Sequence, residues 1–338
     1  MPNIVLCYPI KDYQLAWIQD AIPTEWQVIN AGQEGISEAI LDADIFCGHA
    51  KVPVPWEQVT QQGRLKWIQS SAAGLDHCLK PEVIDSGIVV SSCSGLFANQ
   101  VAEQTLALLY GWFRQLPTFF RQKSECRFER QPTHDLHGKS IGIIGLGGNG
   151  RRIGELLAPL GNTLLATDAF LDDCPDYISE LHPPSELHSV LSRVDIVILG
   201  VPLNQSTEHL IDEAALEAMK PGSLLVNVAR GQVVDETALV SALNRGHLAG
   251  AAIDVTEVEP LPPESPLWSM DNVIITPHVG AQSAHRVDDS TKLFCVNLRR
   301  WQESKPPWNQ VDKNLGFPRP SHRIPLNDLR SSWEDLFA

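Results

Sequence analysis

A glycine-rich loop is the part of the sequence whose residue spacing most directly indicates a chemical role. It reads GLGGNG over residues 145–150 and follows the apolar run 140–144. Glycines at these spacings allow a tight turn at Gly145, a close approach of a pyrophosphate at Gly147, and close packing of a following helix at Gly150. The sequence therefore predicts a dinucleotide-binding turn between a buried strand and a helix.

The end of the loop and the next predicted strand indicate which dinucleotide would bind. The amides of Gly148 and Asn149 would face the anion at the start of a helix that we expect over 151–160. The next predicted strand ends at Asp168, 18 residues after the last glycine of the loop. A carboxylate there accepts hydrogen bonds from ribose hydroxyls and repels a 2′-phosphate, and the segment AFLDD at 169–173 adds acid but no cation. The sequence favours NAD over NADP, although a solvated carboxylate at a strand end remains the alternative for Asp168.

Parallel strands are needed to position such a loop, and short apolar runs recur at intervals of about 20 residues with helical patterns between them. This pattern predicts an α/β fold with parallel sheets. Composition alone places the entry to a second domain between residues 101 and 139. Strands are expected at 3–7, 26–29, 44–48, 65–69 and 88–90, then at 140–144, 163–167, 195–199, 223–227, 251–254 and 273–275, and helices at 36–41, at 101–113 and from 283 to about 301.

Composition excludes several classes of protein. The chain has 338 residues, enough for two domains at about 150 residues each. A net charge of −15 argues against a nucleic-acid binder or a polybasic membrane binder. No run reaches the roughly 18 apolar residues of a membrane span, and the start of the chain does not resemble a signal peptide. The seven cysteines form no CxxC pair, which predicts reduced thiols in a cytoplasmic protein and no metal site.

Seven blocks of sequence, all in the expected order, resemble the D-isomer-specific 2-hydroxyacid dehydrogenases. The resemblance implies two Rossmann-like domains with parallel sheets and a cleft between them. Residues 1–100 and 285–338 would form the substrate-binding domain, and residues 101–284 the dinucleotide-binding domain. It thus assigns the helix that starts near Val101 to the cofactor domain. The blocks are IQSSAAGLDH (68–77), VAEQTLALL (101–109), GKSIGIIGLGGNGRRIG (138–154), VPLNQSTEHLI (201–211), MKPGSLLVNVARGQVVDETAL (219–239), LAGAAIDVTEVEPLP (248–262) and NVIITPHVGAQS (272–283).

The resemblance implies a catalytic set made of Arg230, Glu259 and His278. Reduction of a 2-keto acid needs a hydride at C2, a proton at the oxygen and an anchor for the carboxylate. An arginine supplies a permanently charged fork for the carboxylate and the carbonyl. A histidine titrates near neutral pH and can deliver or remove the proton, and an adjacent glutamate orients the ring and favours the imidazolium. We therefore expect an NAD-dependent enzyme that interconverts a small D-2-hydroxy acid and its 2-keto acid.

Further positions follow from the same resemblance. Asp254 is similar to the acid that contacts the nicotinamide carboxamide. A loop beneath the cofactor would include Val201, Pro202 and Thr207, with backbone contacts from Val228 and Ala229, and the substrate carboxylate would be received by amides of Ala72, Ala73 and Gly74 beside Arg230. The sequence departs from the common pattern at Gly148–Asn149, where an apolar residue often precedes the last glycine, and at Gln104, where a histidine is frequent after the glutamate.

Two other functions remain open at this point. Some relatives of this fold bind NAD(H) and act as regulatory interaction proteins, and the intact set of three residues argues against this without excluding it. Formate oxidation ranks lower, because that branch carries glutamine at the position of Glu259. The resemblance also implies a homodimer built on the cofactor domains, and we expect the segment 116–130 to form part of that contact. A short amphipathic helix is expected around residues 326–336.

Overall fold

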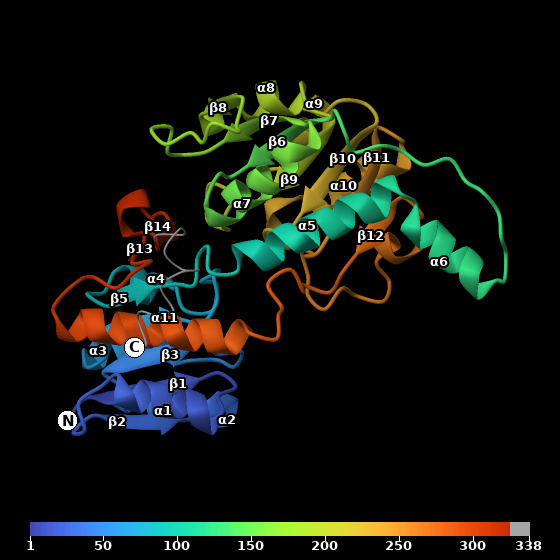
Figure 1. Cartoon of the computed structure of the whole chain (residues 1–338). Coiled ribbons are helices and arrows are strands. Elements are labelled where there is room, and N and C mark those ends of the chain that lie inside the picture. Colours follow the sequence, from blue (N-terminus) through green and yellow to red (C-terminus); the bar gives the residue numbers. More distant parts are fainter. Residues whose placement is uncertain (325–338) are drawn as a thin grey trace. The chain divides into compact units, whose positions relative to one another are not determined.

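The computed structural model describes residues 1–324 of the chain (Figure 1). The chain divides into two compact units. One contains residues 1–97 and the chain from residue 283 onward, and the other contains residues 98–282. Each unit is built on its own parallel sheet, with helices connecting successive strands.

The first unit contains a five-stranded sheet in the order β2-β1-β3-β4-β5, and every neighbouring pair is parallel. Its strands are β1 (Asn3–Cys7), β2 (Gln27–Asn30), β3 (Ile45–Gly48), β4 (Trp67–Ser70) and β5 (Val89–Ser91). Its helices are α1 (Asp12–Asp20), α2 (Gly32–Ala39), α3 (Trp56–Gln62), α4 (Pro81–Ile84) and α11 (Arg286–Gln302). A two-stranded antiparallel pair, β13 (Val311–Asp312) and β14 (Phe317–Pro318), follows α11.

The second unit contains a seven-stranded parallel sheet in the order β12-β11-β10-β9-β6-β7-β8. Its strands are β6 (Ser140–Ile144), β7 (Thr163–Thr167), β8 (Glu180–His182), β9 (Ile196–Leu199), β10 (Ser223–Asn227), β11 (Leu248–Ile253) and β12 (Val273–Ile275). Its helices are α5 (Ala98–Phe113), α6 (Leu116–Ser124), α7 (Gly148–Leu157), α8 (Leu187–Leu191), α9 (Glu213–Ala218) and α10 (Glu236–Asn244). The strand order reverses at β6, which lies between β7 and β9. Ligands of doubly wound sheets bind at the carboxyl ends of the strands beside such a reversal.

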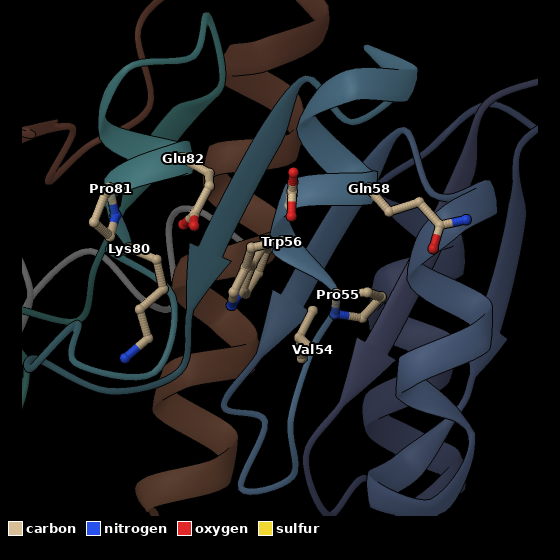
Figure 2. Close-up of a pocket in the computed structure, with 8 residues that line it drawn as sticks. Val54, Pro55, Trp56, Gln58, Lys80, Pro81 and Glu82 are labelled. Atoms are coloured by element: carbon tan, nitrogen blue, oxygen red, sulfur yellow. The ribbon is translucent and has the colours of Figure 1, made fainter.

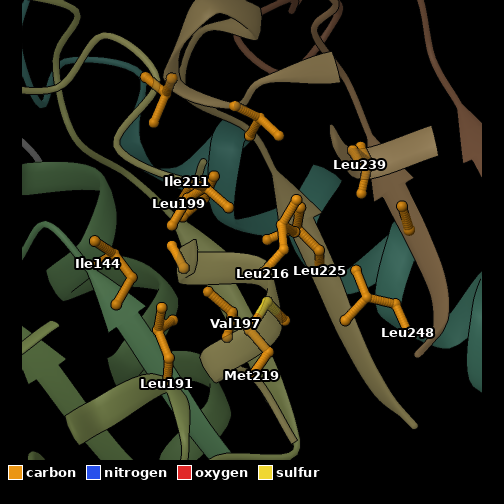
Figure 3. Close-up of a cluster of buried hydrophobic side chains, with 14 of the residues drawn as sticks. Ile144, Leu191, Val197, Leu199, Ile211, Leu216, Met219, Leu225, Leu239 and Leu248 are labelled. Atoms are coloured by element: carbon orange, nitrogen blue, oxygen red, sulfur yellow. The ribbon is translucent and has the colours of Figure 1, made fainter. Parts of the chain in front are cut away.

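Helices cover both faces of the seven-stranded sheet, which explains why its strands are continuously apolar. Val197 and Leu199 of β9 pack on one face in a cluster with residues of α8, α9 and α10 (Figure 3). Ile196 and Ile198 of the same strand belong to a cluster on the other face, which includes residues of α5 and α7. Alternate residues of one strand are thus buried on opposite sides of the sheet.

The structure confirms the fold class and most of the expected strands. Three differences have physical reasons. The helix after the glycine loop begins at Gly148 and not at Arg151, because the glycines themselves form its first turn. Strand β8 was not expected, since it is a short edge strand with no apolar run. Strand β11 begins at Leu248, three residues before the predicted strand. The helix expected around 326–336 lies outside the described residues.

Candidate active site

The glycine loop joins β6 to α7 and leaves an open approach at one residue. Gly145 has a φ of 98°, and a Cβ there would lie 2.8 Å from the backbone of Gly200. A Cβ at Gly150 would lie 2.0 Å from the carbonyl oxygen of Gly145, so the helix could not pack against the turn. At Gly147, by contrast, a Cβ would meet no atom within 4 Å. The turn is therefore tight on its inner side and open at the start of α7, as binding of a pyrophosphate requires.

Asp168 follows β7 and holds a fixed position beside this loop. Its Oδ2 accepts a hydrogen bond of 2.7 Å from the amide of Leu146, and its Oδ1 accepts one of 2.9 Å from the amide of Phe170. Each carboxylate oxygen can accept a further hydrogen bond. The Asp168 carboxylate is therefore oriented so that it could accept hydrogen bonds from both hydroxyls of a ribose, which fits NAD.

Glu259 and His278 form a hydrogen-bonded pair within the second unit. The Nδ1 of His278 lies 2.7 Å from Oε2 of Glu259, and both side chains remain partly exposed. The amide of Thr256 donates to the other oxygen of Glu259 at 3.3 Å. Burial alone would raise the pKa of Glu259, but the hydrogen bond and charge of His278, the Thr256 amide and the charge of Arg230 together lower this pKa.

The loop that carries Arg230 packs directly against the loop that carries Glu259. A Cβ at Gly231 would lie 1.9 Å from the backbone of Thr256, so only glycine permits this approach. Nη1 of Arg230 donates to the carbonyl of Ala229 at 2.7 Å, and Asn227 Nδ2 donates to the carbonyl of Arg230 at 2.9 Å. The structure thus brings Arg230, Glu259 and His278 together at the carboxyl end of the sheet.

Asp254 is buried behind the histidine. The carbonyl of Asp254 accepts a 2.7 Å hydrogen bond from the amide of His278, whose φ is 54°. Its carboxylate accepts hydrogen bonds from Val279, Gly280 and Thr276. Sequence reasoning did not identify Thr276, although a hydroxyl directly before Pro277–His278 was a usable signal.

The other predicted cofactor contacts lie at the ends of neighbouring strands. After β9, Thr207 Oγ1 donates to the carbonyl of Pro202 at 2.6 Å and closes the loop that begins at Val201. Val228 and Ala229 directly follow β10 and are nearly buried. These residues lie in the same unit as the glycine loop.

The loop predicted to receive the substrate carboxylate belongs to the first unit, after β4. The amide of Ala72 donates to Ser70 Oγ at 3.1 Å, and its carbonyl accepts from the amide of Cys93 at 2.9 Å. Ala73 is exposed and Gly74 is half-buried. The Ala72 amide already donates its hydrogen bond to Ser70, so it is not available to an anion. Of the three predicted amides in this loop, those of Ala73 and Gly74 remain.

A pocket of about 550 Å³ lies elsewhere in the first unit (Figure 2). It lies between the start of α3, with Trp56, and the start of α4, with Lys80 and Glu82. None of the predicted site residues lines it. Among residues 1–324, no three His, Cys, Asp or Glu side chains are placed to hold a metal ion. Over the same range, no helix has the length and apolar character to cross a membrane.

A seven-stranded parallel sheet with a glycine turn where the strand order reverses defines the doubly wound dinucleotide-binding proteins. Residues 106–280, more than half of the chain, match the NAD binding domain of the D-isomer specific 2-hydroxyacid dehydrogenases. The chain therefore belongs to this family of NAD(P)-dependent enzymes.

Similar proteins cover nearly the whole chain. A glyoxylate reductase from Thermofilum pendens is 32% identical over 268 residues, which are 78% of this chain and 79% of that protein. A D-isomer specific 2-hydroxyacid dehydrogenase from Xanthobacter autotrophicus, solved with NADPH and MES, is 28% identical with a TM-score of 0.79, covering 93% of this chain and 99% of that one. An NADPH-dependent glyoxylate/hydroxypyruvate reductase from Sinorhizobium meliloti, solved with NADP and malonate, is 27% identical with a TM-score of 0.75, covering 94% and 98%.

Proposed function

We propose that the chain interconverts a small D-2-hydroxy acid and its 2-keto acid, with His278 as the acid and base. The observation that carries this proposal is the 2.7 Å contact between His278 and Glu259, in the unit that also holds Arg230 and the glycine loop. A regulatory NAD(H)-binding protein would not need an imidazole with a carboxylate partner beside a fixed guanidinium.

We infer a task for each side chain, supported by these contacts. Nδ1 of His278 donates to Glu259, so Nε2 carries the proton that moves to the carbonyl oxygen during reduction. Glu259 stabilises the imidazolium and fixes the plane of the ring. The guanidinium of Arg230 holds the substrate carboxylate and polarises the carbonyl. Bound NADH supplies the hydride that reaches C2.

A panel of 2-keto acids tests this function. We expect oxidation of NADH with glyoxylate, hydroxypyruvate or pyruvate, and a product of D configuration from hydroxypyruvate or pyruvate, whose products have a stereocentre at C2. Larger 2-keto acids belong in the same panel, to establish which size of substrate the enzyme accepts. No turnover with any member of the panel, although NADH binds, would contradict the proposal and favour the regulatory alternative.

We further propose that the enzyme prefers NADH to NADPH. The carboxylate of Asp168 is fixed by two amides, and residues 169–173 carry no cation to receive a 2′-phosphate. Two of the similar structures contain NADPH or NADP, so the comparison of both cofactors is informative. Asp168→Ser should lower kcat/KM with NADH about tenfold and so reduce the ratio of kcat/KM with NADH to kcat/KM with NADPH. The exposed Asp172→Ser is the matched control, and an unchanged ratio in Asp168→Ser would contradict the assignment.

We also propose a homodimer in which α6 and the segment after it take part. In Figure 1, α6 extends from the end of α5, away from the sheet of its own unit, and a long irregular segment returns from it. Phe120 is 66% exposed and Phe128 is fully exposed, which is unusual for aromatic rings without a partner surface. Sedimentation should give a dimer that Phe120→Ser with Phe128→Ser weakens, whereas Tyr13→Ser in the other unit should not. A monomer at micromolar concentration would contradict this proposal.

A reducing compartment such as the cytoplasm is proposed from the cysteines. All seven are free thiols, and five of them are buried. Burial raises the pKa of Cys93 and of Cys295 to about 12, so these thiols stay protonated and unreactive. Cell fractionation tests the location.

A further inference from the structure

Gln104 lies on α5, and its side chain reaches the loop that follows β12. Its Nε2 donates a hydrogen bond of 2.9 Å to Oγ1 of Thr276. The contact joins residues 172 positions apart in the sequence. An amide on a buried helix thus contacts the residue two positions before His278.

Thr276 passes this contact on to a buried carboxylate. Its hydroxyl has one hydrogen, which it donates to Oδ1 of Asp254 at 2.6 Å. Its oxygen can then only accept a hydrogen bond from Gln104. The donor on Gln104 therefore fixes the direction of the relay, which runs from Gln104 through Thr276 to Asp254.

Asp254 in turn holds the turn that contains His278. Its Oδ1 also accepts from the amide of Val279 at 3.0 Å, and its Oδ2 accepts from the amide of Gly280 at 2.7 Å. Asp254 is 3% exposed, so its carboxylate oxygens depend on these donors for their hydrogen bonds. A Cβ at Gly280 would lie 2.8 Å from Oδ2 of Asp254 and 3.8 Å from Cγ of Gln104. Gly280 is thus enclosed between the two side chains, which leaves the turn little freedom to shift.

We propose that Gln104 is a positioning residue for the reaction, acting through Thr276 to fix the Asp254 carboxylate and the turn that carries His278. The inference rests on the proposed function and on the family resemblance, which implies that Asp254 contacts the nicotinamide carboxamide. An amide has no ionisable proton, so the relay keeps its direction at every pH at which the enzyme works. Without this donor, the Thr276 hydroxyl is free to rotate away, and Asp254 loses its shortest hydrogen bond.

The first test measures binding and does not depend on turnover. Affinities for NADH and for ADP-ribose, which lacks the nicotinamide, are compared in the parent chain, in Gln104→Leu and in Gln104→Glu. We expect the affinity for ADP-ribose to stay unchanged and the advantage of NADH over ADP-ribose to shrink. The loss should be largest in Gln104→Glu, whose carboxylate cannot donate to Thr276 and competes with Asp254 for the hydroxyl proton. The matched control is Gln61→Leu, at an exposed amide on α3 whose Nε2 donates to Oε1 of Glu57 at 3.2 Å. Equal losses for NADH and ADP-ribose, or no loss for either, would overturn the inference.

The second test is a double-mutant cycle on kcat with a 2-keto acid. Gln104→Leu and Thr276→Val should each lower kcat about tenfold, because the imidazole is displaced from its working position. The double variant should lose no more than either single variant, because both remove the same relay. Effects that multiply, or a kcat unchanged in Gln104→Leu, would overturn the inference. A parent chain with no turnover would instead refute the proposed function, and the binding test would still decide the role of Gln104.

Discussion

Two histidines follow strands of the two sheets, and their surroundings differ sharply. His278 follows β12, is partly exposed and has the carboxylate of Glu259 2.7 Å from Nδ1. His77 follows β4, and its ring stacks on His49 with centroids 4.0 Å apart. Both ring nitrogens of His77 are buried without a hydrogen bond of good geometry. Burial, and then the neighbouring His49, lower the pKa of His77 to about 3.

The comparison shows that the position of a histidine at a strand end does not by itself make it a proton carrier. His77 is neutral at any physiological pH, because its pKa is lowered to about 3. His278 has both a carboxylate partner and an exposed edge, which are the two conditions for acid and base catalysis near neutral pH. Both parallel sheets place a histidine after a strand. The side chain that a loop places beside the imidazole ring decides whether that ring can transfer a proton.

The largest expected effect is at His278. His278→Asn removes the proton carrier and should lower kcat for reduction about 1,000-fold, with NADH binding retained. His188→Asn, at an exposed histidine on α8, is the matched control and should have the activity of the parent chain. Steady-state kinetics with the best substrate of the panel measures both. A His278→Asn variant with near-normal kcat would remove the contrast between the two histidines.

The glycine loop gives the next largest effects and separates folding from binding. Gly150→Ala places a Cβ against the carbonyl of Gly145 and should lower the free energy of unfolding by about 2 kcal/mol. In Gly147→Ala the added Cβ meets no atom within 4 Å, so the melting temperature should stay unchanged. The affinity for NADH should fall about tenfold, because the Cβ lies where the pyrophosphate would approach. Thermal unfolding and NADH titration of both variants check this. If Gly147→Ala bound NADH normally, the open side of the loop would not be the cofactor site.

Glu259→Gln tests the partner of His278. A neutral amide stabilises the imidazolium less, so kcat/KM for reduction should fall about tenfold at neutral pH, and its alkaline limb should move to lower pH. The pKa of Glu259 is lowered in the folded chain, so its carboxylate contributes stability above its unfolded pKa, and this contribution is lost as the pH falls through the folded pKa. The melting-temperature deficit of the variant should therefore be largest near neutral pH and shrink in acid. The exposed Glu264→Gln is the control, and a deficit independent of pH would contradict the pairing.

The smallest effect concerns His77 and is one of stability alone. Because its pKa is about 3 in the folded chain, the unfolded chain binds an extra proton between roughly pH 6.5 and pH 3. Stability contributed by the neutral ring is lost as the pH falls through this window. His77→Gln should reduce the slope of the unfolding free energy against pH by up to about 1.4 kcal/mol per pH unit. Chemical denaturation at several pH values measures this slope, and an unchanged slope would mean that His77 is not buried as a neutral ring.

The sequence predicted the elements best where strands are covered on both faces. The strands at 140–144, 163–167 and 223–227 have the expected bounds, because a doubly covered strand is a continuous apolar run. Strand β8 is an edge strand with half-buried residues, so it leaves no such signal. Gly148 was assigned to the loop because glycine is a poor helix former, yet it begins α7.

The candidate site was only partly visible in the sequence. Family blocks pointed to Arg230, Glu259 and His278, and the structure brings these residues together. The hydrogen bond from Gln104 on α5 to Thr276 joins residues 172 positions apart, which no local pattern encodes. The burial of His77 against His49 is likewise a tertiary feature, since a histidine in a loop is more often exposed.

Transfer of deuterium from NADH labelled at C4 measures the central claim most directly. The chain is mixed with the labelled NADH and glyoxylate or hydroxypyruvate, and the product is examined by mass spectrometry. Our account predicts deuterium at C2 of the 2-hydroxy acid with the parent chain and a rate about 1,000-fold lower with His278→Asn. A product without deuterium, or equal rates in the two chains, would contradict it.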